Sequence, residues 1–141
     1  MTLLIFPIIA LSVEQTILTL RSKNILAFHL EKICAVEKIK LISFLDGLNK
    51  GKHRFMLFAL PHSLDPGKGW GALVQTLILK GLFLMVAIDE MHCVPKYGTR
   101  SFRITFAELL ENIFIYLHQS PCPIALLSMT RTLTSELMTQ F

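Results

Sequence analysis

The sequence has 141 residues, a net charge of +4 and a hydrophobic fraction of 52%, which fits one domain, residues 1–141, with a substantial core. Its longest apolar run, Leu3 to Leu11, contains Pro7. That run is too short for a membrane span, which needs about 20 residues, and the charge permits an anionic partner without requiring one.

Five apolar runs along the chain are typical of β-strands. They are Thr2–Pro7, Ile25–Leu30, Arg54–Leu60, Leu82–Asp89 and Pro123–Leu127. Strands that are buried on both faces, as in a parallel sheet, have apolar residues in succession rather than in alternation. These runs therefore predict a largely parallel sheet.

Helical patterns lie between and after these runs. They cover Ser12–Leu20, Ala35–Leu48, Trp70–Leu79, Phe106–His118 and Thr134–Phe141. In the second of them, apolar residues recur at helical spacing, which predicts an amphipathic helix. These residues are Val36, Ile39, Ile42 and Leu45.

The alternation of strands and helices predicts an α/β fold with a parallel sheet and helices on both faces. In such sheets, ligands bind in the crevice outside the carboxyl ends of the strands. Asp89 and Glu90 stand at the end of the fourth apolar run, so the sequence places two carboxylates where a ligand is expected.

Two adjacent acids at a strand exit are suited to phosphate chemistry. One carboxylate can hold a hard cation such as Mg²⁺, usually through water. The other can orient a water molecule for attack on a phosphate, and His92 can connect this centre to a neighbouring strand by hydrogen bonds. The alternative interpretation is that Asp89 and Glu90 begin a solvated loop and that His92 has no role in it.

Six segments of the chain resemble motifs of the first RecA-like domain of RecQ-type DNA helicases, in helicase superfamily 2. Asp89-Glu90-Met91-His92-Cys93 resembles the DEAH-box motif of that family, DEAHC. The other segments, in chain order, are Phe6–Gln15, Phe28–Leu30, Leu60–Leu64, Tyr97–Arg103 and Ala125–Thr130. The resemblance extends from about Thr2 to Thr134.

This resemblance implies a RecA-like domain of the P-loop NTPase type, with ATP and Mg²⁺ as cofactors and DNA as partner. By the resemblance, Asp89 holds Mg²⁺, Glu90 positions the attacking water, and His92 connects to Ser128 and Thr130.

The resemblance also assigns a DNA-sensing role to an aromatic loop after the DEAH box. In this chain the corresponding residues are Tyr97, Phe102 and Arg103, which would contact single-stranded DNA and couple it to ATP hydrolysis. Stacking of a base on an aromatic ring contributes about 1–3 kcal/mol. Alternatively, the two rings fold back onto the sheet.

The chain departs from the family pattern at the phosphate-binding loop. No GxxxxGK[ST] segment occurs in the 141 residues. Such a loop holds the phosphates with its backbone N–H groups and its Lys, and positioning is most of phosphoryl-transfer catalysis. We therefore expect an incomplete RecA-like domain which by itself has no helicase activity and very weak or no ATP hydrolysis.

Three accounts remain open at this stage. The chain is a fragment of a larger helicase, a non-catalytic nucleic-acid-binding or interaction module derived from one, or an unrelated doubly wound domain. In RecA-like folds the P-loop strand is internal, so its absence should leave strand edges without a neighbour. We therefore expect self-association or a completing chain.

A few residues outside the motifs also have alternative roles. Trp70, at the start of a predicted helix, is interpreted as a packing residue rather than a base-stacking platform. The histidines are too scattered for a zinc site. Three cysteines without a CxxC pair favour a reducing compartment, so a nuclear or cytoplasmic location is expected.

Overall fold

The computed structural model of the protein describes residues 1–6, 12–46, 54–65, 69–89 and 113–129. The described strands form one five-stranded sheet in the order β2-β3-β1-β4-β5, and every neighbouring pair is parallel. The strands are β1 (Thr2–Ile5), β2 (Leu26–His29), β3 (Phe55–Ala59), β4 (Met85–Ile88) and β5 (Ala125–Ser128).

Helices connect the strands at the predicted places. The helical elements are α1 (Ser12–Ser22), the 3₁₀ helix η1 (Leu30–Lys32), α2 (Ala35–Asp46), the 3₁₀ helix η2 (Pro61–Leu64) and α3 (Gly69–Leu79). Residues 113–119 are helical, which overlaps the fourth predicted helix and extends one residue past its predicted end at His118. The prediction for Thr134–Phe141 lies outside the described residues.

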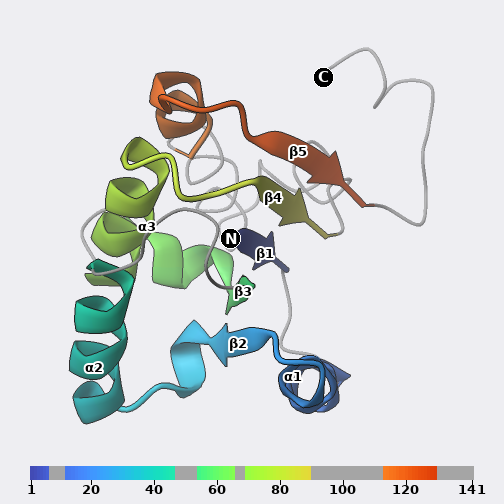
Figure 1. The fold of residues 1–141 in the computed structure, drawn as a ribbon. Helices are drawn as coiled ribbons and strands as arrows, with labels where there is room; N and C mark the ends of the chain where they lie inside the picture. The colour runs from blue at the N-terminus through green and yellow to red at the C-terminus, as the bar shows by residue number, and fades with distance from the viewer. Residues whose placement is uncertain (7–11, 47–53, 66–68, 90–112, 130–141) are drawn as a thin grey trace.

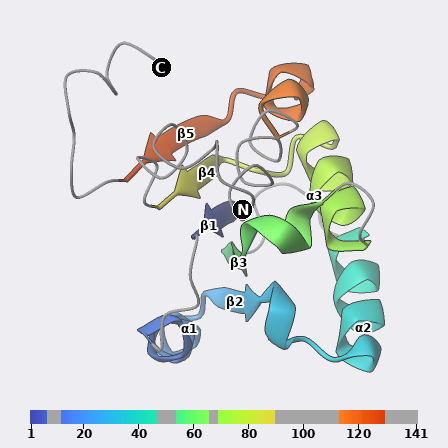
Figure 2. The same cartoon turned by 180° about the vertical axis from the view of Figure 1, so that it is seen from behind.

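The handedness of parallel connections explains which face each helix covers. The chain crosses from β1 to β2 in one direction along the sheet, and the next three connections run in the opposite direction. Because strand–helix–strand crossovers are right-handed, a reversal of direction places the helix on the other face. Accordingly, α1 lies on one side of the sheet, and α2, α3 and residues 113–119 lie on the other (Figures 1 and 2). The predicted α/β class is thus confirmed.

The core consists of two layers separated by the sheet. On one face, Leu3, Leu57 and Val86 are fully buried within the layer formed with α2 and α3. On the other face, Phe58 packs with Ile17 of α1 in a smaller cluster. Complete burial of such a side chain stabilises the fold by about 1.5–3 kcal/mol, so the three central strands supply most of the sheet's hydrophobic stabilisation.

The helix predicted over Ala35–Leu48 is present as α2. Val36 and Ile39 are 62% and 70% exposed, whereas Leu41 and Leu45 are buried. α2 has apolar residues around much of its circumference, so periodicity alone does not select the side that packs on the sheet.

The start of α3 is a close packing point. A side chain at Gly71 would collide with the backbone oxygens of Leu64 and Asp65, so only glycine lets α3 approach η2 this closely. Trp70 packs against the larger core layer, and the Lys38 ammonium lies 4.5 Å from its ring centroid. This packing agrees with the interpretation of Trp70 from the sequence.

The expectation that interior strands would lack a neighbour is not met among the described strands. They form one continuous sheet, with β2 at one edge and β5 at the other. Within the described part of the chain, no helix is long and apolar enough to cross a membrane.

Candidate functional site

The carboxyl ends of β1, β4 and β5 meet at one edge of the sheet, which we call the carboxyl edge. In the ladder register, Ile88 of β4 lies opposite Ile5 of β1 on one side and Ser128 of β5 on the other. Asp89 follows directly after Ile88. The structure therefore brings Asp89 and Ser128, two residues separated by 39 positions, to neighbouring strand ends.

Backbone hydrogen bonds continue past the strand ends and fix this geometry. The N–H of Asp89 donates to the carbonyl of Ile5 over 2.8 Å, and the N–H of Met129 donates to the carbonyl of Ile88 over 2.8 Å. On the far side of β1, the Phe6 N–H donates to the Ala59 carbonyl over 3.2 Å. The backbone that carries Asp89 is thus held from both sides.

The connections place this edge at a topological switch point. The chain leaves β1 towards α1 on one face, whereas it leaves β3 towards α3 on the other face. Where adjacent strands send their chains to opposite faces, a crevice opens outside their carboxyl ends, and ligands bind there. Asp89 follows β4, the other neighbour of β1, so its backbone lies beside the strand at which the connections change face.

Asp89 is half-buried, and its carboxylate has the chemistry to hold a cation at the exit of β4. Mg²⁺ is commonly held by only one or two carboxylates together with water and substrate phosphates, so a single Asp fits it. The described residues contain no group of three or more His, Cys, Asp or Glu side chains that could enclose a metal.

The remaining predicted site residues lie outside the described part of the chain. They are Glu90, His92, Tyr97, Phe102, Arg103 and Thr130. Ser128 is described, and it is exposed at the last position of β5. The predicted connection from His92 to Ser128 and Thr130 therefore stays a prediction.

Other segments singled out in the sequence also end at the carboxyl edge. His29 closes β2, and the segment Leu60–Leu64 directly follows β3 and forms η2. Within η2, the buried Ser63 hydroxyl donates to the Leu60 carbonyl over 2.8 Å, which holds the turn closed. Segments dispersed through the sequence are therefore gathered at one side of the sheet.

One polar cluster at this edge was missed by the sequence analysis. His29 is 4% exposed, and its Nδ1 lies 2.8 Å from Oε2 of Glu31. Oε1 of Glu31 accepts the Leu60 N–H over 2.9 Å, and the Phe6 ring meets the imidazole edge-on at 5.6 Å between centroids. Glu31 thus ties the exit of β2 to the exit of β3.

This cluster has a structural role because Glu31 pairs with His29 at the exit of β2 and accepts the Leu60 N–H at the exit of β3. A buried polar group without a partner costs about 1–3 kcal/mol, which the Glu31 contacts avoid here. Its signal in the sequence is a His and an acid two positions apart at a strand exit, next to η1. That pattern is too common to identify the cluster before the fold is known.

Comparison with known proteins gives one informative match. The chain is 27% identical over 137 residues to the ATP-dependent DNA helicase Q1 of Rattus norvegicus. The matched region covers 97% of this chain and 21% of the rat protein, so the chain spans about a fifth of the length of this relative. No family model matches the chain.

Proposed function

We propose that this chain forms part of the ATP-binding domain of a RecQ-like DNA helicase, an enzyme that uses ATP hydrolysis to unwind DNA in the 3′-to-5′ direction. The observation that carries this proposal is the position of Asp89 directly after β4, beside β1, where the connections change face, and next to the end of β5. The similarity to the rat ATP-dependent DNA helicase over nearly the whole chain supports it.

In this proposal, Asp89 and the residues that follow it have different roles in phosphoryl transfer. Asp89 would hold hydrated Mg²⁺, which would supply positive charge for the phosphates. Glu90 would orient the attacking water, and His92 would connect this centre to Ser128 and Thr130. The backbone of Asp89 is held by its hydrogen bond to the Ile5 carbonyl, which supports a fixed position for this carboxylate.

Tyr97, Phe102 and Arg103 supply the nucleic-acid side of the mechanism. They contact single-stranded DNA and transmit its presence to the carboxyl edge, from which they are separated by a short stretch of sequence. Base stacking on aromatic rings and pairing of Arg with phosphate are the usual forms of such contact. A nuclear or cytoplasmic place of action follows from a DNA substrate.

The 141 residues alone are expected to hydrolyse ATP very weakly or not at all, because they contain no GxxxxGK[ST] segment. A second candidate function follows from the same observation. The chain is then a non-catalytic nucleic-acid-binding or interaction module derived from a helicase. Its net charge of +4 favours an anionic partner.

The deciding experiment identifies the native product by immunoprecipitation and peptide mass spectrometry, and then measures its DNA-stimulated ATP hydrolysis. If a GxxxxGK[ST] segment precedes Met1, we expect Glu90→Gln to lower turnover by about 100-fold or more. Asp89→Asn should raise the Mg²⁺ concentration needed for activity. Lys23→Gln, in the exposed turn after α1, is the control and should retain the wild-type rate.

Two outcomes would contradict the proposal. Wild-type turnover in Glu90→Gln would remove the assigned catalytic role. If the native product is the 141-residue chain without ATP turnover, the binding module becomes the better account. That account requires binding to single-stranded DNA that weakens as salt is raised, since phosphate contacts release counterions. Absence of DNA binding at low salt would reject it as well.

A further inference from the structure

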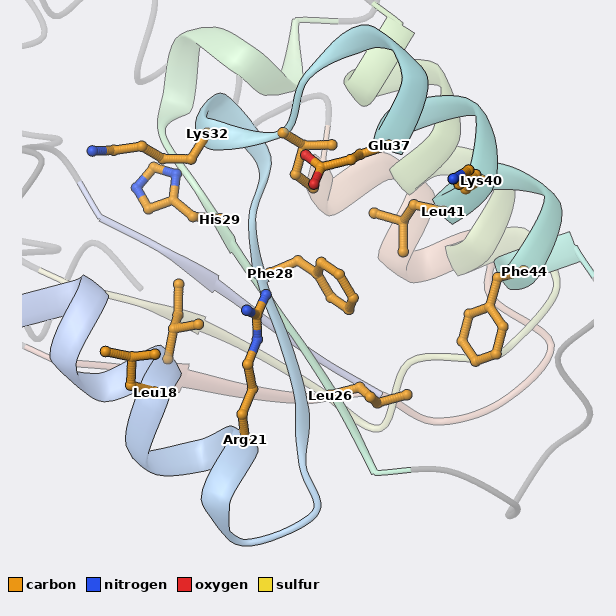
Figure 3. Close-up of a pocket in the computed structure, with 12 residues that line it drawn as sticks. Leu18, Arg21, Leu26, Phe28, His29, Lys32, Glu37, Lys40, Leu41 and Phe44 are labelled. Carbon is orange, nitrogen blue, oxygen red and sulfur yellow. The ribbon is translucent and has the colours of Figure 1, made fainter.

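An open groove lies at the β2 edge of the sheet, far from the carboxyl ends of β4 and β5. Its volume is about 690 Å³, and its lining comes from α1, β2, η1 and α2 (Figure 3). α1 covers one face of the sheet and α2 covers the other, so the two helices form the walls and the outer edge of β2 lies between them. The volume is in the range of sites that bind ligands or peptide side chains, about 300–1,000 Å³.

The groove has an apolar floor that remains accessible to solvent. We define the floor as Leu18, Leu26, Phe28 and Phe44. Leu18 is 65% exposed, Phe44 40% and Leu26 37%. Single exposed apolar residues are common, but several that converge from three elements on one concave surface are typical of an interaction site.

Cations surround this floor. We define the basic rim as Arg21 of α1, Lys32 of η1 and Lys40 of α2. Glu37 is the one acid among the lining residues, and its Oε2 accepts the Cys34 N–H over 3.2 Å. The rim therefore gives the groove an excess positive charge, which complements an anionic partner and repels a cationic one.

The aromatic floor does not suit the stacking of a nucleic-acid base. Phe55 of β3 stacks on Phe28 at 5.3 Å between centroids, and the Arg21 guanidinium lies 5.2 Å from the same ring on the side of the open edge. Phe44 is also turned towards Phe55, at 6.1 Å and 27°. Base stacking requires an open ring face, and the Phe28 ring already has a stacked ring and a guanidinium as neighbours.

The edge of β2 is also closed to an added strand. The Leu26 N–H donates to the Arg54 carbonyl, so the alternation of a parallel strand turns the Ala27 carbonyl outwards. Arg21 Nε donates to that carbonyl over 3.0 Å. A partner in the groove therefore binds through side chains on the floor and rim, rather than by extending the ladder.

We propose that this groove docks an acidic peptide segment of a partner protein, with aliphatic side chains on the apolar floor and carboxylates paired with the basic rim. Aliphatic side chains need no open ring face, and carboxylates match the charge of Arg21, Lys32 and Lys40. The site lies outside the proposed ATPase machinery, so it serves recruitment of a partner and not turnover.

The test measures fluorescence anisotropy of a labelled synthetic peptide in which Asp or Glu alternates with Leu. The expected result is saturable binding that Lys40→Glu weakens by about tenfold and Phe44→Ala by a similar factor. Lys23→Gln, an exposed lysine beyond the rim, is the matched control and should bind within about twofold of wild type. A peptide with Lys in place of the acids should not bind.

Several results would overturn the inference. The acidic peptide does not bind, or Lys40→Glu and Phe44→Ala bind it as well as wild type does. The groove would be assigned to nucleic acid if a single-stranded oligonucleotide displaced the peptide and if Lys40→Glu also weakened binding of that oligonucleotide. Circular dichroism confirms that each variant is folded. The ATPase assay separates this inference from the proposed function, because groove variants should leave the native product's turnover unchanged.

Discussion

The two edges of the sheet are built in opposite ways. At β2, helices stand on both sides of the strand, Arg21 bonds the outward carbonyl of Ala27, and Phe28 stacks on Phe55. At β5, all four residues are exposed, including Leu126 at 48% and Leu127 at 43%. Edge strands invite pairing with other chains unless something blocks them. The β2 edge is blocked by side chains, and the β5 edge has no comparable block among the described residues.

The residues of β5 resemble those of a strand from the interior of a sheet. Successive residues of a strand point to opposite faces, and Leu126 and Leu127 make both faces apolar, as in strands from the interior of a parallel sheet. The N–H groups of Ala125 and Met129 donate to the side of β4, so the backbone of Leu126 and Ser128 faces away from it. β5 therefore has the sequence of an interior strand at an edge position.

The largest expected effect is a difference in the free energy of unfolding between a variant at the β2 edge and a variant at the β5 edge. Phe28→Ala should lower the free energy of unfolding by about 2–4 kcal/mol, because it removes a ring stacked between Phe55 and Arg21. Leu127→Ala should lower it by less, about 1 kcal/mol or below, since the residue is 43% exposed. Urea denaturation of both variants measures the difference. Equal losses would show that the β5 edge is packed as tightly as the β2 edge.

A second prediction concerns association through β5. The chain should self-associate at high concentration, and Leu126→Lys should weaken that association by roughly tenfold because a charge on an apolar edge strand opposes pairing. Sedimentation velocity over a concentration series measures it. Leu26→Lys, the same change at the β2 edge, is the control and should have no effect on association. A wild-type chain that sediments as a sharp monomer throughout would contradict the prediction.

The smallest effect is expected when Arg21, which covers the β2 edge, is replaced. Arg21→Gln removes the bond to the Ala27 carbonyl and the contact over Phe28, at a cost of about 1 kcal/mol in unfolding free energy. Thermal melts of Arg21→Gln and Lys23→Gln should separate the two, with Lys23→Gln unchanged. If Arg21→Gln also increases self-association, the arginine protects the edge as proposed, whereas an unchanged melt and unchanged association would refute that role.

Local pattern predicted most of the elements. Each described strand lies within about three residues of its predicted run, because buried strands of a parallel sheet have the continuous apolar character that the runs show. α3 begins at Gly69, one residue before the predicted start at Trp70. The buried side of α2 was not predictable, since Val36 and Ile39 are as apolar as the residues that pack.

The sequence predicted that Asp89 stands at the end of a strand, but it did not predict which residues of other strands lie beside it. An acid after an apolar run marks the end of a strand, so Asp89 was placed correctly at the exit of β4. The approach of Ser128 depends on β5 pairing with β4, and nothing between residues 89 and 128 encodes that pairing locally. The roles of Glu90 and His92 rest on the resemblance to RecQ-type helicases.

The sequence by itself determined the succession of strands and helices, because the spacing of apolar residues and the position of turns are properties of short segments. Only the tertiary structure decided the strand order, and with it which strands became edges, which strand ends met at the carboxyl edge, and where α1 and α2 left a groove. The contacts involved, such as Glu31 with Leu60 and Ile5 with Asp89, join residues far apart in the chain. Long-range contacts of this kind leave no periodic trace in the sequence, so folding alone brings them together.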